Sequence, residues 1–405
     1  MNSVGKPAWP IRRLEEVTLG MRNGVVGSVV DHYAPVGVPY FMANNVRQQR
    51  LDDSRLVHID PAFHRKHRIS ELRAGDVLTV QTGWIGVSCV VPAKYEGANA
   101  HALIISRPDP EKVLGDFLCY LLNSSVGRRA IQRVQTGGGR PHLNTTELRK
   151  LAFPIPPITL QRRIVAVLSQ LDALTDQAAR MTAALARQKR GLYQQLLSGR
   201  KRFPQYQQRP WQLSALSRHV TRVVRRNGAD CSLVLTASGE RGLVDQRRYF
   251  NRTVAGADLT KYYLLKRGEF AYNRSAMNGY PFGATKRLDE HDEGALSTLY
   301  LCFSVSDPQL DSDYLKHIFE SGALNRQLRP IARVGARAHG LLNVSDEDFL
   351  SISIPLPAID EQLRIAKVLN ASERGLTLLA GLKAKIEVLK HALLTRLLLN
   401  EIAIS

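Results

Sequence analysis

The stretch PIPPITLQRRIVAVL, residues 154–168, returns in a second version as PLPAIDEQLRIAKVL, residues 355–369. The two versions align without a gap at an offset of 201 residues. The identical pairs are Pro154/Pro355, Pro156/Pro357, Ile158/Ile359, Gln161/Gln362, Arg163/Arg364, Ile164/Ile365, Val167/Val368 and Leu168/Leu369. A single period of this length is too long for a solenoid repeat, so it indicates duplication of a larger module.

The duplication extends on both sides of this phrase. Downstream, the matching pairs at the same offset are Lys189/Lys390, Leu192/Leu393, Leu196/Leu397 and Leu197/Leu398. Upstream, LRAGDVL (72–78) resembles LKRGEFA (265–271), and WPIRRL (9–14) resembles WQLSAL (211–216). The sequences between these matching stretches differ. We therefore expect four parts: a globular domain at 1–153, a helical segment at 154–203, a second globular domain at 204–354, and a second helical segment at 355–405.

The repeated segments have the pattern of long coiled-coil helices. Each follows a proline-rich stretch and a candidate N-cap, Thr159 or Asp360, and the first should end near Gly199. Alternating spacings of three and four indicate a seam. The expected seam positions are Leu171, Leu174, Ala178, Met181, Leu185, Gln188 and Leu192, then Ser372, Gly375, Leu379, Leu382, Ile386, Leu389 and Leu393. A helix over 160–198 would be roughly 60 Å long, and pairing of the two helices is favoured over separate packing on each domain.

The globular segments combine strand and helix patterns. DVLTVQTGWIGVSCVV (76–91) is typical of strands joined by glycine turns, and residues 116–134 and 313–328 each have the pattern of one helix. Trp9 and Trp211 recur at matching positions and are expected to anchor the two cores. The expected fold class is α+β (mixed α/β).

The composition points to a polyanionic partner. The net charge is +20 over 405 residues. Such a charge is typical of proteins that meet nucleic acid or an anionic membrane surface, and nucleic acid is favoured here over an excess charge that serves only solubility. No signal-peptide pattern or apolar run of membrane-spanning length occurs, so we expect a cytoplasmic protein. The four cysteines are Cys89, Cys119, Cys231 and Cys302, and none forms a C-x-x-C pair, which argues against a zinc ribbon and for a reducing compartment.

Motifs of catalysis are missing from the sequence. There is no G-x-x-x-x-G-K-[ST] phosphate loop, no D/N-P-P-Y/F motif of amino-methyltransferases, and no H-E-x-x-H or other metal-spaced histidine cluster. The glycines of TGGGRPH (136–142) do not have phosphate-loop spacing, and this segment is interpreted either as a flexible turn or as a DNA-facing loop. The sequence therefore favours a binding protein over a catalyst, with no metal site of its own.

Several of these phrases resemble a known family. PIPPITLQRRIVAVLSQLD, LYQQLLSGRKRF and IPLPAIDEQLRIAKVL look like the conserved regions of the specificity subunit of type I restriction–modification enzymes. Members carry a P-x-P-x-x-x-x-Q-x-x-I phrase at each helix start, often with acidic residues there. Asp360 and Glu361 fit that pattern, whereas Thr159 and Leu160 depart from it.

The resemblance implies a fold and a set of partners. It implies two globular target-recognition domains, 1–153 and 204–354, joined by two long antiparallel coiled-coil helices in a pseudo-twofold duplication. Each domain would read one half of a split double-stranded DNA site. Two methyltransferase subunits, and two motor-nuclease subunits where the complex also cleaves, would dock on the chain. No cofactor is expected in this chain, because S-adenosylmethionine and ATP with Mg²⁺ belong to the partner subunits.

Base reading requires side chains that fork onto base edges, such as Arg on guanine and Asn or Gln on adenine. The candidates in the first domain are Asn44, Asn45, Arg47, Arg50, Gln81, Thr82, Trp84, Arg140 and His142. Those in the second domain are Asn273, Arg274, Asn278, Arg337 and His339. Each could instead be a solvated surface residue, a turn cap or a phosphate contact. Trp84 in the first domain and Tyr280 in the second could contact bases, but buried packing is favoured for both. In the helical segment, Gln188 could set the alignment of the coiled-coil seam, or it could be a solvated edge position.

Two other functions stay open on the sequence alone. One is a coiled-coil scaffold that binds nucleic acid without sequence preference, and the other is an enzyme with an unrecognised nuclease site. A salt-sensitive gel shift with no preferred site would favour the first, and Mg²⁺-dependent cleavage by the isolated chain would favour the second.

Overall fold

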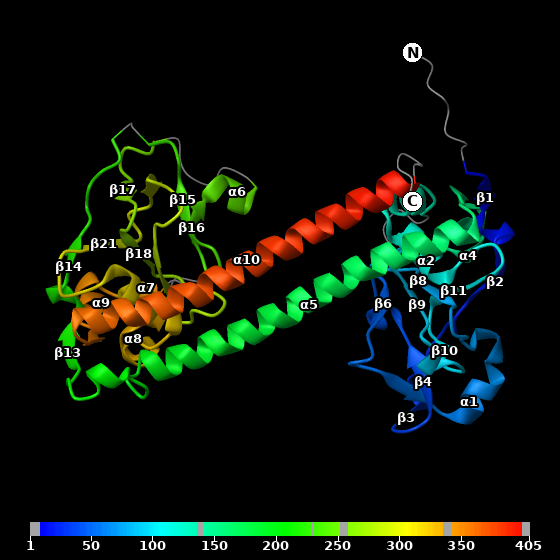
Figure 1. The fold of residues 1–405 in the computed structure, drawn as a ribbon, viewed down its shortest axis with the longest axis horizontal. Helices are drawn as coiled ribbons and strands as arrows, with labels where there is room; N and C mark the ends of the chain where they lie inside the picture. Colours follow the sequence, from blue (N-terminus) through cyan, green and yellow to red (C-terminus); the bar gives the residue numbers. More distant parts are fainter. Residues whose placement is uncertain (1–8, 136–140, 229–230, 252–257, 335–341, 399–405) are drawn as a thin grey trace, which may run out of the picture. The chain divides into compact units, whose positions relative to one another are not determined.

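The computed structural model describes residues 9–135, 141–228, 231–251, 258–334 and 342–398. They form two compact units (Figure 1): unit 1 contains Met1–Ala179 and Gly381–Ser405, and unit 2 contains Arg180–Ala380. The division crosses both long helices rather than falling at their starts. The reason is that each globular domain shares its core with the start of one helix and the end of the other.

Unit 1 is built on a four-stranded antiparallel sheet. Its strands, in spatial order, are β2 (Thr18–Asn23), β11 (Leu103–Pro108), β8 (Val77–Val80) and β9 (Ser88–Val90). All of β8 is buried, because alternate residues point to opposite faces: Val77 joins the core under helix α2 (Gly115–Asn123), and Leu78 joins a second core. The sequence therefore correctly predicted strands joined by glycine turns.

The remaining elements of unit 1 surround this sheet. A second sheet has the order β10 (Asn99–Ala100), β4 (Val38–Phe41), β7 (Val57–Ile59) and β3 (Tyr33–Ala34), and two pairs are β1 (Ile11–Arg13) with β12 (Ala152–Pro154) and β5 (Val46–Arg47) with β6 (Arg50–Leu51). The short helices are α1 (Pro61–Lys66), α3 (Ser125–Arg133) and α4 (Thr145–Lys150).

Unit 2 repeats the central sheet. Its strands, in spatial order, are β14 (Val220–Arg222), β21 (Leu301–Val305), β18 (Phe270–Asn273) and β19 (Ala284–Arg287). The strand pairs are β13 (Gln212–Ala215) with β24 (Ser353–Leu356), β15 (Leu235–Ser238) with β16 (Gly242–Asp245), β17 (Tyr263–Lys266) with β20 (Glu293–Leu296), and β22 (Arg333–Val334) with β23 (Leu342–Asn343). The short helices are α6 (Gln246–Phe250), α7 (Ser312–Ser321), α8 (Asn325–Ile331) and α9 (Asp346–Leu350). The same strand order in both units confirms the duplication.

The repeated LRAGDVL and LKRGEFA phrases form the same turn before β8 and β18. Gly75 and Gly268 have φ values of 85° and 87°, which disfavour a side chain. The acid that follows each glycine closes the turn: Asp76 accepts from the backbone N–H of Arg73 at 2.9 Å, and Glu269 accepts likewise at 2.8 Å. The weak upstream similarity therefore reflects one backbone conformation.

Two stretches that each looked like one helix are helix pairs. Residues 116–134 divide at Ser124, whose side chain accepts from the backbone N–H of Gly127 and begins α3. Residues 313–328 divide at Gly322, whose φ of 72° ends α7 before α8. In both cases the apolar period continues across the break, so periodicity alone could not show it.

The two long helices are α5 (Ile158–Leu196) and α10 (Ile359–Leu398). They begin just before the residues proposed as N-caps, because the carbonyls of Pro157 and Ala358 already accept the first helical bonds. Thr159 and Asp360 therefore lie within the first turn. Gly199 follows the end of α5 with a φ of 70°, as expected for a residue that stops a helix.

The glutamine of the repeated phrase fastens each long helix to its domain. Gln161 is fully buried: its Oε1 accepts from the backbone N–H of Leu114 at 2.8 Å, and its Nε2 donates to the carbonyls of Lys112 (2.9 Å) and Pro156 (2.8 Å). Gln362 makes the same three bonds in unit 2, with Asp311, Gln309 and Pro357. The repeated phrase is thus a docking joint between a helix start and a globular domain.

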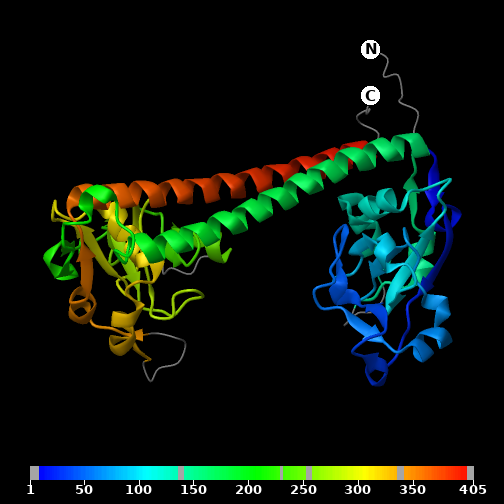
Figure 2. The same ribbon diagram turned by 60° about the horizontal axis from the view of Figure 1, so that its bottom comes forward.

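Within each unit, the segments of α5 and α10 run side by side and antiparallel (Figures 1 and 2). In unit 1 they contribute Ile164, Leu168, Leu394 and Leu397 to one core. In unit 2 they contribute Leu192, Leu196, Ile365 and Leu369 to another. The expected fold class, with paired antiparallel helices, is confirmed.

Nine of the fourteen expected seam positions are correct. The positions that are buried or half-buried as predicted include Leu171, Ala178, Leu185 and Leu192 in α5, and Ser372, Gly375, Leu379, Ile386 and Leu393 in α10. The positions that are exposed instead are Leu174, Met181, Gln188, Leu382 and Leu389. In α5 the residue that follows each exposed position is half-buried in its place. These residues are Thr175, Thr182 and Lys189. The helix ends, held in the domain cores, set the rotation of the helix and override local apolarity.

The two matching tryptophans are half-buried and pack against the core of their own unit. The Trp211 Nε1–H donates to Glu361 at 3.0 Å, and Arg202 binds the same buried carboxylate at 2.7 Å and 3.0 Å. Leu160 stands at the position of Glu361 in unit 1 and packs against the core there. The departure from an acidic helix start therefore replaces a buried ion pair with an apolar contact.

Candidate nucleic-acid interface

In each unit, the loop that follows β8 or β18 is hydrogen-bonded to a segment much later in the chain, near residue 143 in unit 1 and residue 342 in unit 2. The carbonyl of Gln81, after β8, accepts from the backbone N–H of Leu143 at 3.0 Å. The carbonyl of Arg274, after β18, accepts from Leu342 at 2.7 Å. The structure thus brings residues 81–87 near 142–143 in unit 1, and residues 274–283 near 342–343 in unit 2. The sequence candidates converge on one edge of each sheet.

Two candidates at this edge have structural roles. The Gln81 side chain is buried and donates to Asn23 Oδ1 (3.2 Å) and to the carbonyl of Leu143 (3.3 Å). Arg274 donates to the carbonyls of Val344 and Leu299 and forms an ion pair with Asp346. These side chains hold the loops together, and their role in base reading stays a prediction.

Asn45 also has a structural role. It is 1% exposed; its Oδ1 accepts from the backbone N–H of Met42 at 2.9 Å, and its Nδ2 donates to the carbonyl of Asp52 at 3.0 Å. This side chain closes the turn before the β5–β6 hairpin and cannot face DNA. Its neighbour Asn44 is exposed.

An aromatic and basic cluster lies on the surface of unit 1. Trp84 is 63% exposed, so the expectation that it packs in the core is wrong. The Arg47 guanidinium lies 5.3 Å from the Trp84 ring centroid and 3.4 Å from Asp52. Arg50 and Thr82 are exposed beside these elements. An exposed ring with adjacent guanidinium groups is a suitable surface for stacking and hydrogen bonding to bases.

The remaining candidates differ in their availability. Asn278 is exposed, whereas Asn273 and His142 are half-buried. The Asn273 Oδ1 accepts from the backbone N–H of Ser275 at 3.1 Å, which shapes the loop. Arg140, Arg337 and His339 lie outside the described residues.

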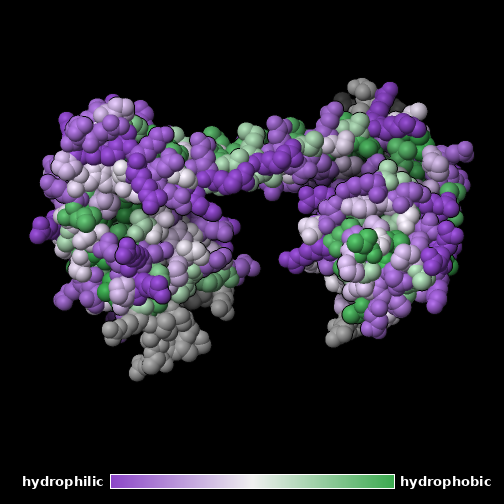
Figure 3. Space-filling model, turned by 90° about the horizontal axis from the view of Figure 1, so that it is seen from below, coloured by the Kyte–Doolittle hydropathy of each residue, from purple (hydrophilic) through white to green (hydrophobic). Residues whose placement is uncertain are grey.

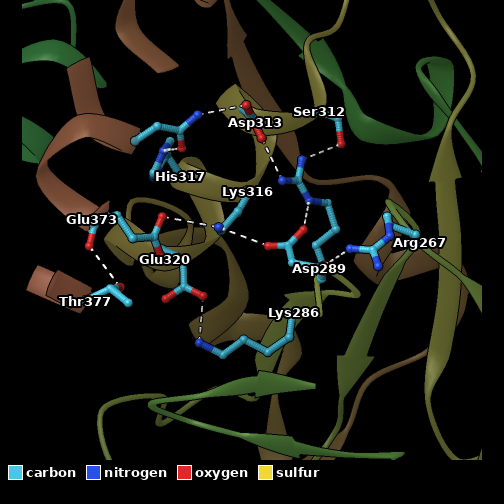
Figure 4. Close-up of polar contacts among 12 residues, drawn as sticks. Arg267, Lys286, Asp289, Ser312, Asp313, Lys316, His317, Glu320, Glu373 and Thr377 are labelled. Atoms are coloured by element: carbon cyan, nitrogen blue, oxygen red, sulfur yellow. Dashed lines mark hydrogen bonds and ion pairs between the residues drawn. The ribbon is translucent and has the colours of Figure 1, made fainter. Parts of the chain in front are cut away.

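A charged network in unit 2 connects the globular domain to the helices (Figure 4). Lys316 of α7 binds Asp289 at 3.0 Å and Glu373 of α10 at 3.2 Å, and Lys189 of α5 lies 3.9 Å from the same Glu373. These groups line an open cavity of about 610 Å³. Because acids and bases here pair with each other, the network is best explained as a joint that fixes the domain on the helices.

Lys286 is the most buried ammonium of this region, at 3% exposure. It binds Glu320 (2.7 Å), the hydroxyl of Tyr280 (2.7 Å) and the carbonyl of Gly239 (2.9 Å). Burial lowers the pKa of Lys286, and the nearby Glu320 carboxylate opposes that change. Tyr280 is thereby held in an internal bond network, consistent with the packing role expected for it.

Sequence reasoning missed a second exposed aromatic and basic cluster, on α6 and the β15–β16 turn. Tyr249 and Phe250 are each 43% exposed, and Arg241, Arg247 and Arg248 are exposed around them. The signal was present as RRYF at 247–250, in which basic and aromatic residues adjoin.

The fold and these loops define a class of protein: a duplicated frame on paired helices that presents unlike loops at equivalent edges. The model of the type I restriction modification DNA specificity domain matches residues 69–185 and 249–388, more than half of the chain. The chain therefore belongs to the type I restriction–modification DNA specificity family, as the repeated phrases indicated.

Relatives and solved structures agree with this. A Methanocaldococcus jannaschii protein named type I restriction enzyme MjaX specificity subunit is 23% identical over 198 residues, which is 47% of this chain. The chain spans 45% of that relative's length. The type I restriction–modification S subunit from M. genitalium has a TM-score of 0.60 at 13% identity, covering 100% and 99% of the two chains. A chain from a study of type I R-M complex assembly has a TM-score of 0.56 at 17% identity, covering 98% and 99%. At these identities the likeness establishes the fold.

None of the helices among the described residues is long and apolar enough to cross a membrane. No group of three or more His, Cys, Asp or Glu side chains within the described part of the chain could hold a metal ion.

Proposed function

We propose that each globular domain reads one half of a split, asymmetric double-stranded DNA site, with the chain acting as the specificity subunit of a type I restriction–modification complex. The observation that carries the proposal is the pair of central sheets with the same strand order and different loops at the equivalent edge. A common frame with unlike side chains suits unlike half-sites, because base edges are read by the side chains that the frame presents.

The residues proposed to contact DNA are those that remain accessible at these edges. In the first domain they are Asn44, Arg47, Arg50, Thr82, Trp84 and His142, and in the second they are Asn273 and Asn278. Arg140, Arg337 and His339 stay candidates on sequence grounds alone. The net charge of +20 would add attraction to the phosphates that does not depend on sequence.

Two methyltransferase subunits, and motor-nuclease subunits in a cleaving complex, are the proposed protein partners. Exposed apolar residues on the long helices support such docking. They include Leu174, Leu382, Val388 and Leu389 in unit 1, and Met181 and Leu378 in unit 2. Hydrophobic residues are visible among hydrophilic ones along the helices (Figure 3). Large apolar side chains exposed in a row are typical of interfaces between subunits.

The chemistry is proposed to belong to the partners. Methyl transfer from S-adenosylmethionine to adenine would take place in the methyltransferase subunits, and ATP with Mg²⁺ would serve the motor-nuclease subunits. This chain would supply the position on DNA. Its family membership supports that division of labour.

Co-expression with the methyltransferase subunit, followed by methylome sequencing, tests the proposal. The expected result is one methylated motif with two different half-sites and a fixed spacer. A strain that lacks this chain should show no such motif. Salt-sensitive binding without any preferred site would overturn the proposal in favour of a general nucleic-acid scaffold, and Mg²⁺-dependent cleavage by the isolated chain would overturn the non-catalytic role.

A further inference from the structure

A small pocket of the second domain lies between three segments that the sequence did not connect. Its volume is about 330 Å³, and its lining includes Glu240 and Arg241 from the β15–β16 turn, Tyr249 from α6 and Asn278 from the β18–β19 loop. These are an aromatic ring, a guanidinium, an amide and a carboxylate, which together offer stacking, donors and acceptors.

The pocket is built rather than accidental. The pocket has one wall from the β15–β16 turn and one from the β18–β19 loop. The buried Lys286 ammonium binds both walls, through the carbonyl of Gly239 in the turn and the hydroxyl of Tyr280 in the loop. Gly239 permits the walls to approach, because a Cβ there would lie 3.2 Å from the carbonyl oxygen of Asn278. One buried ammonium thus holds the two loops in a fixed position relative to each other.

The polar groups at the mouth are available. Arg241, Tyr249 and Asn278 are all exposed. Among the described residues, no hydrogen bond or ion pair is recorded for the Arg241 guanidinium or the Asn278 amide group, whereas the Arg241 backbone N–H is held by Ser238 at 3.2 Å. The backbone is therefore anchored, while the exposed guanidinium and amide groups are accessible to a ligand.

Unit 1 has a corresponding arrangement with different chemistry. There the β5–β6 hairpin contacts β9, as the β15–β16 hairpin contacts β19 in unit 2. The hairpin of unit 1 carries Arg47, which covers the exposed Trp84 of the β8–β9 loop. In both units, then, an arginine from a hairpin lies near the loop that follows β8 or β18 and near an exposed aromatic ring.

We infer that Arg241, Tyr249 and Asn278 form the base-reading site of the second domain, with a base of the second DNA half-site as the ligand. Arg241 and Asn278 present donors to base edges, and the Tyr249 ring offers a stacking surface. Glu240 favours a base over a phosphate, because a carboxylate accepts from an exocyclic amino group and repels a phosphate. This inference rests on the proposed function and adds to it the residues that set the second half-site.

The test uses the full complex with the methyltransferase subunit. Arg241→Ala, Tyr249→Ala and Asn278→Ala are each compared with Arg218→Ala, which removes an exposed arginine of the same domain at a distance from the pocket in sequence and fold. The pocket variants should relax or change one or two bases of the second half-site, with about tenfold less discrimination per lost contact. The first half-site, and the whole motif of Arg218→Ala, should stay unchanged.

The possible outcomes distinguish failure of the base-reading site from failure of the proposed function. An unchanged motif in all three pocket variants, or a change confined to the first half-site, would overturn the inference and leave the proposed function intact. Weaker binding to every sequence with a smaller salt dependence would assign Arg241 to a phosphate and also overturn it. If the unmutated complex itself methylates no defined motif, the proposed function fails. Because the mutated side chains are exposed, thermal unfolding of the variants should match the unmutated chain.

Discussion

Asp172 of α5 and Lys390 of α10 form an ion pair inside unit 1. Their counterparts at the offset of 201, Glu373 and Lys189, form an ion pair inside unit 2, 3.9 Å apart. Each acid meets the lysine of the other helix, as two antiparallel repeats require. The sequence shows both residues of each pair, but only the structure shows which lysine meets which acid.

Reversing the charge at Asp172 tests this pairing. Asp172→Lys should lower the free energy of unfolding by about 1 kcal/mol, because two ammonium groups would meet at a half-buried site. Adding Lys390→Asp should recover most of that loss, as measured by urea denaturation. Strictly additive effects of the two substitutions would show that the residues do not interact.

The buried glutamine of the repeated phrase should be far more sensitive than a glutamine elsewhere on the same helix. Gln161→Met leaves a backbone N–H and two carbonyls without partners, so we expect a loss of about 2–3 kcal/mol of stability. The same substitution at the exposed Gln188 should change stability by less than about 0.5 kcal/mol. Equal effects at the two positions would contradict the joint described for Gln161.

On α10, buried seam residues should affect stability, whereas exposed apolar residues should affect partner binding. Ile386→Ala should cost about 2–4 kcal/mol because its side chain is buried, whereas Leu389→Ala should cost less than about 0.5 kcal/mol. Leu389→Glu should instead weaken co-purification of the methyltransferase subunit.

Leu213→Glu, on an exposed strand position, is the matched control for the last experiment. Loss of the methyltransferase subunit in both variants would point to a general effect of the added charge. Full retention in the Leu389 variant would remove this residue from the proposed docking surface.

Burial of the thiols predicts a loss of stability at alkaline pH. Burial raises the pKa of Cys89 and of Cys302 to about 12, from an ordinary value near 9. Their contribution is complete below pH 9 and declines as the pH rises toward 12, because only the unfolded chain then ionises. Urea midpoints should fall between pH 9 and pH 11, and alkylation of both thiols at pH 8.5 should be slow until the chain unfolds. Rapid alkylation of either thiol in the folded protein would contradict their burial.

Helix length is expected to set the length of the unread DNA spacer. One extra helical turn between Leu171 and Leu192, with a matching turn in α10, adds about 6 Å to the helices, or about two base pairs. Methylome sequencing should show a longer spacer between unchanged half-sites. Altered half-sites would contradict the idea that the helices measure distance while the domains read bases.

The sequence by itself determined the duplication, the two long helices, their pairing and the family, because all of these rest on residues repeated at one offset. It also located the turn at Gly75 and Gly268, since a positive φ favours glycine in any context. The tertiary structure decided what local pattern could not. It placed Thr175 rather than Leu174 inward, because the anchored helix ends set the rotation, and it gave Asn45, Gln81 and Arg274 internal partners. It also joined Arg241, Tyr249 and Asn278, which are up to 37 residues apart in the sequence, at a single pocket. Which side chains are free to meet a ligand depends on contacts between distant segments, and no short stretch of sequence carries that information.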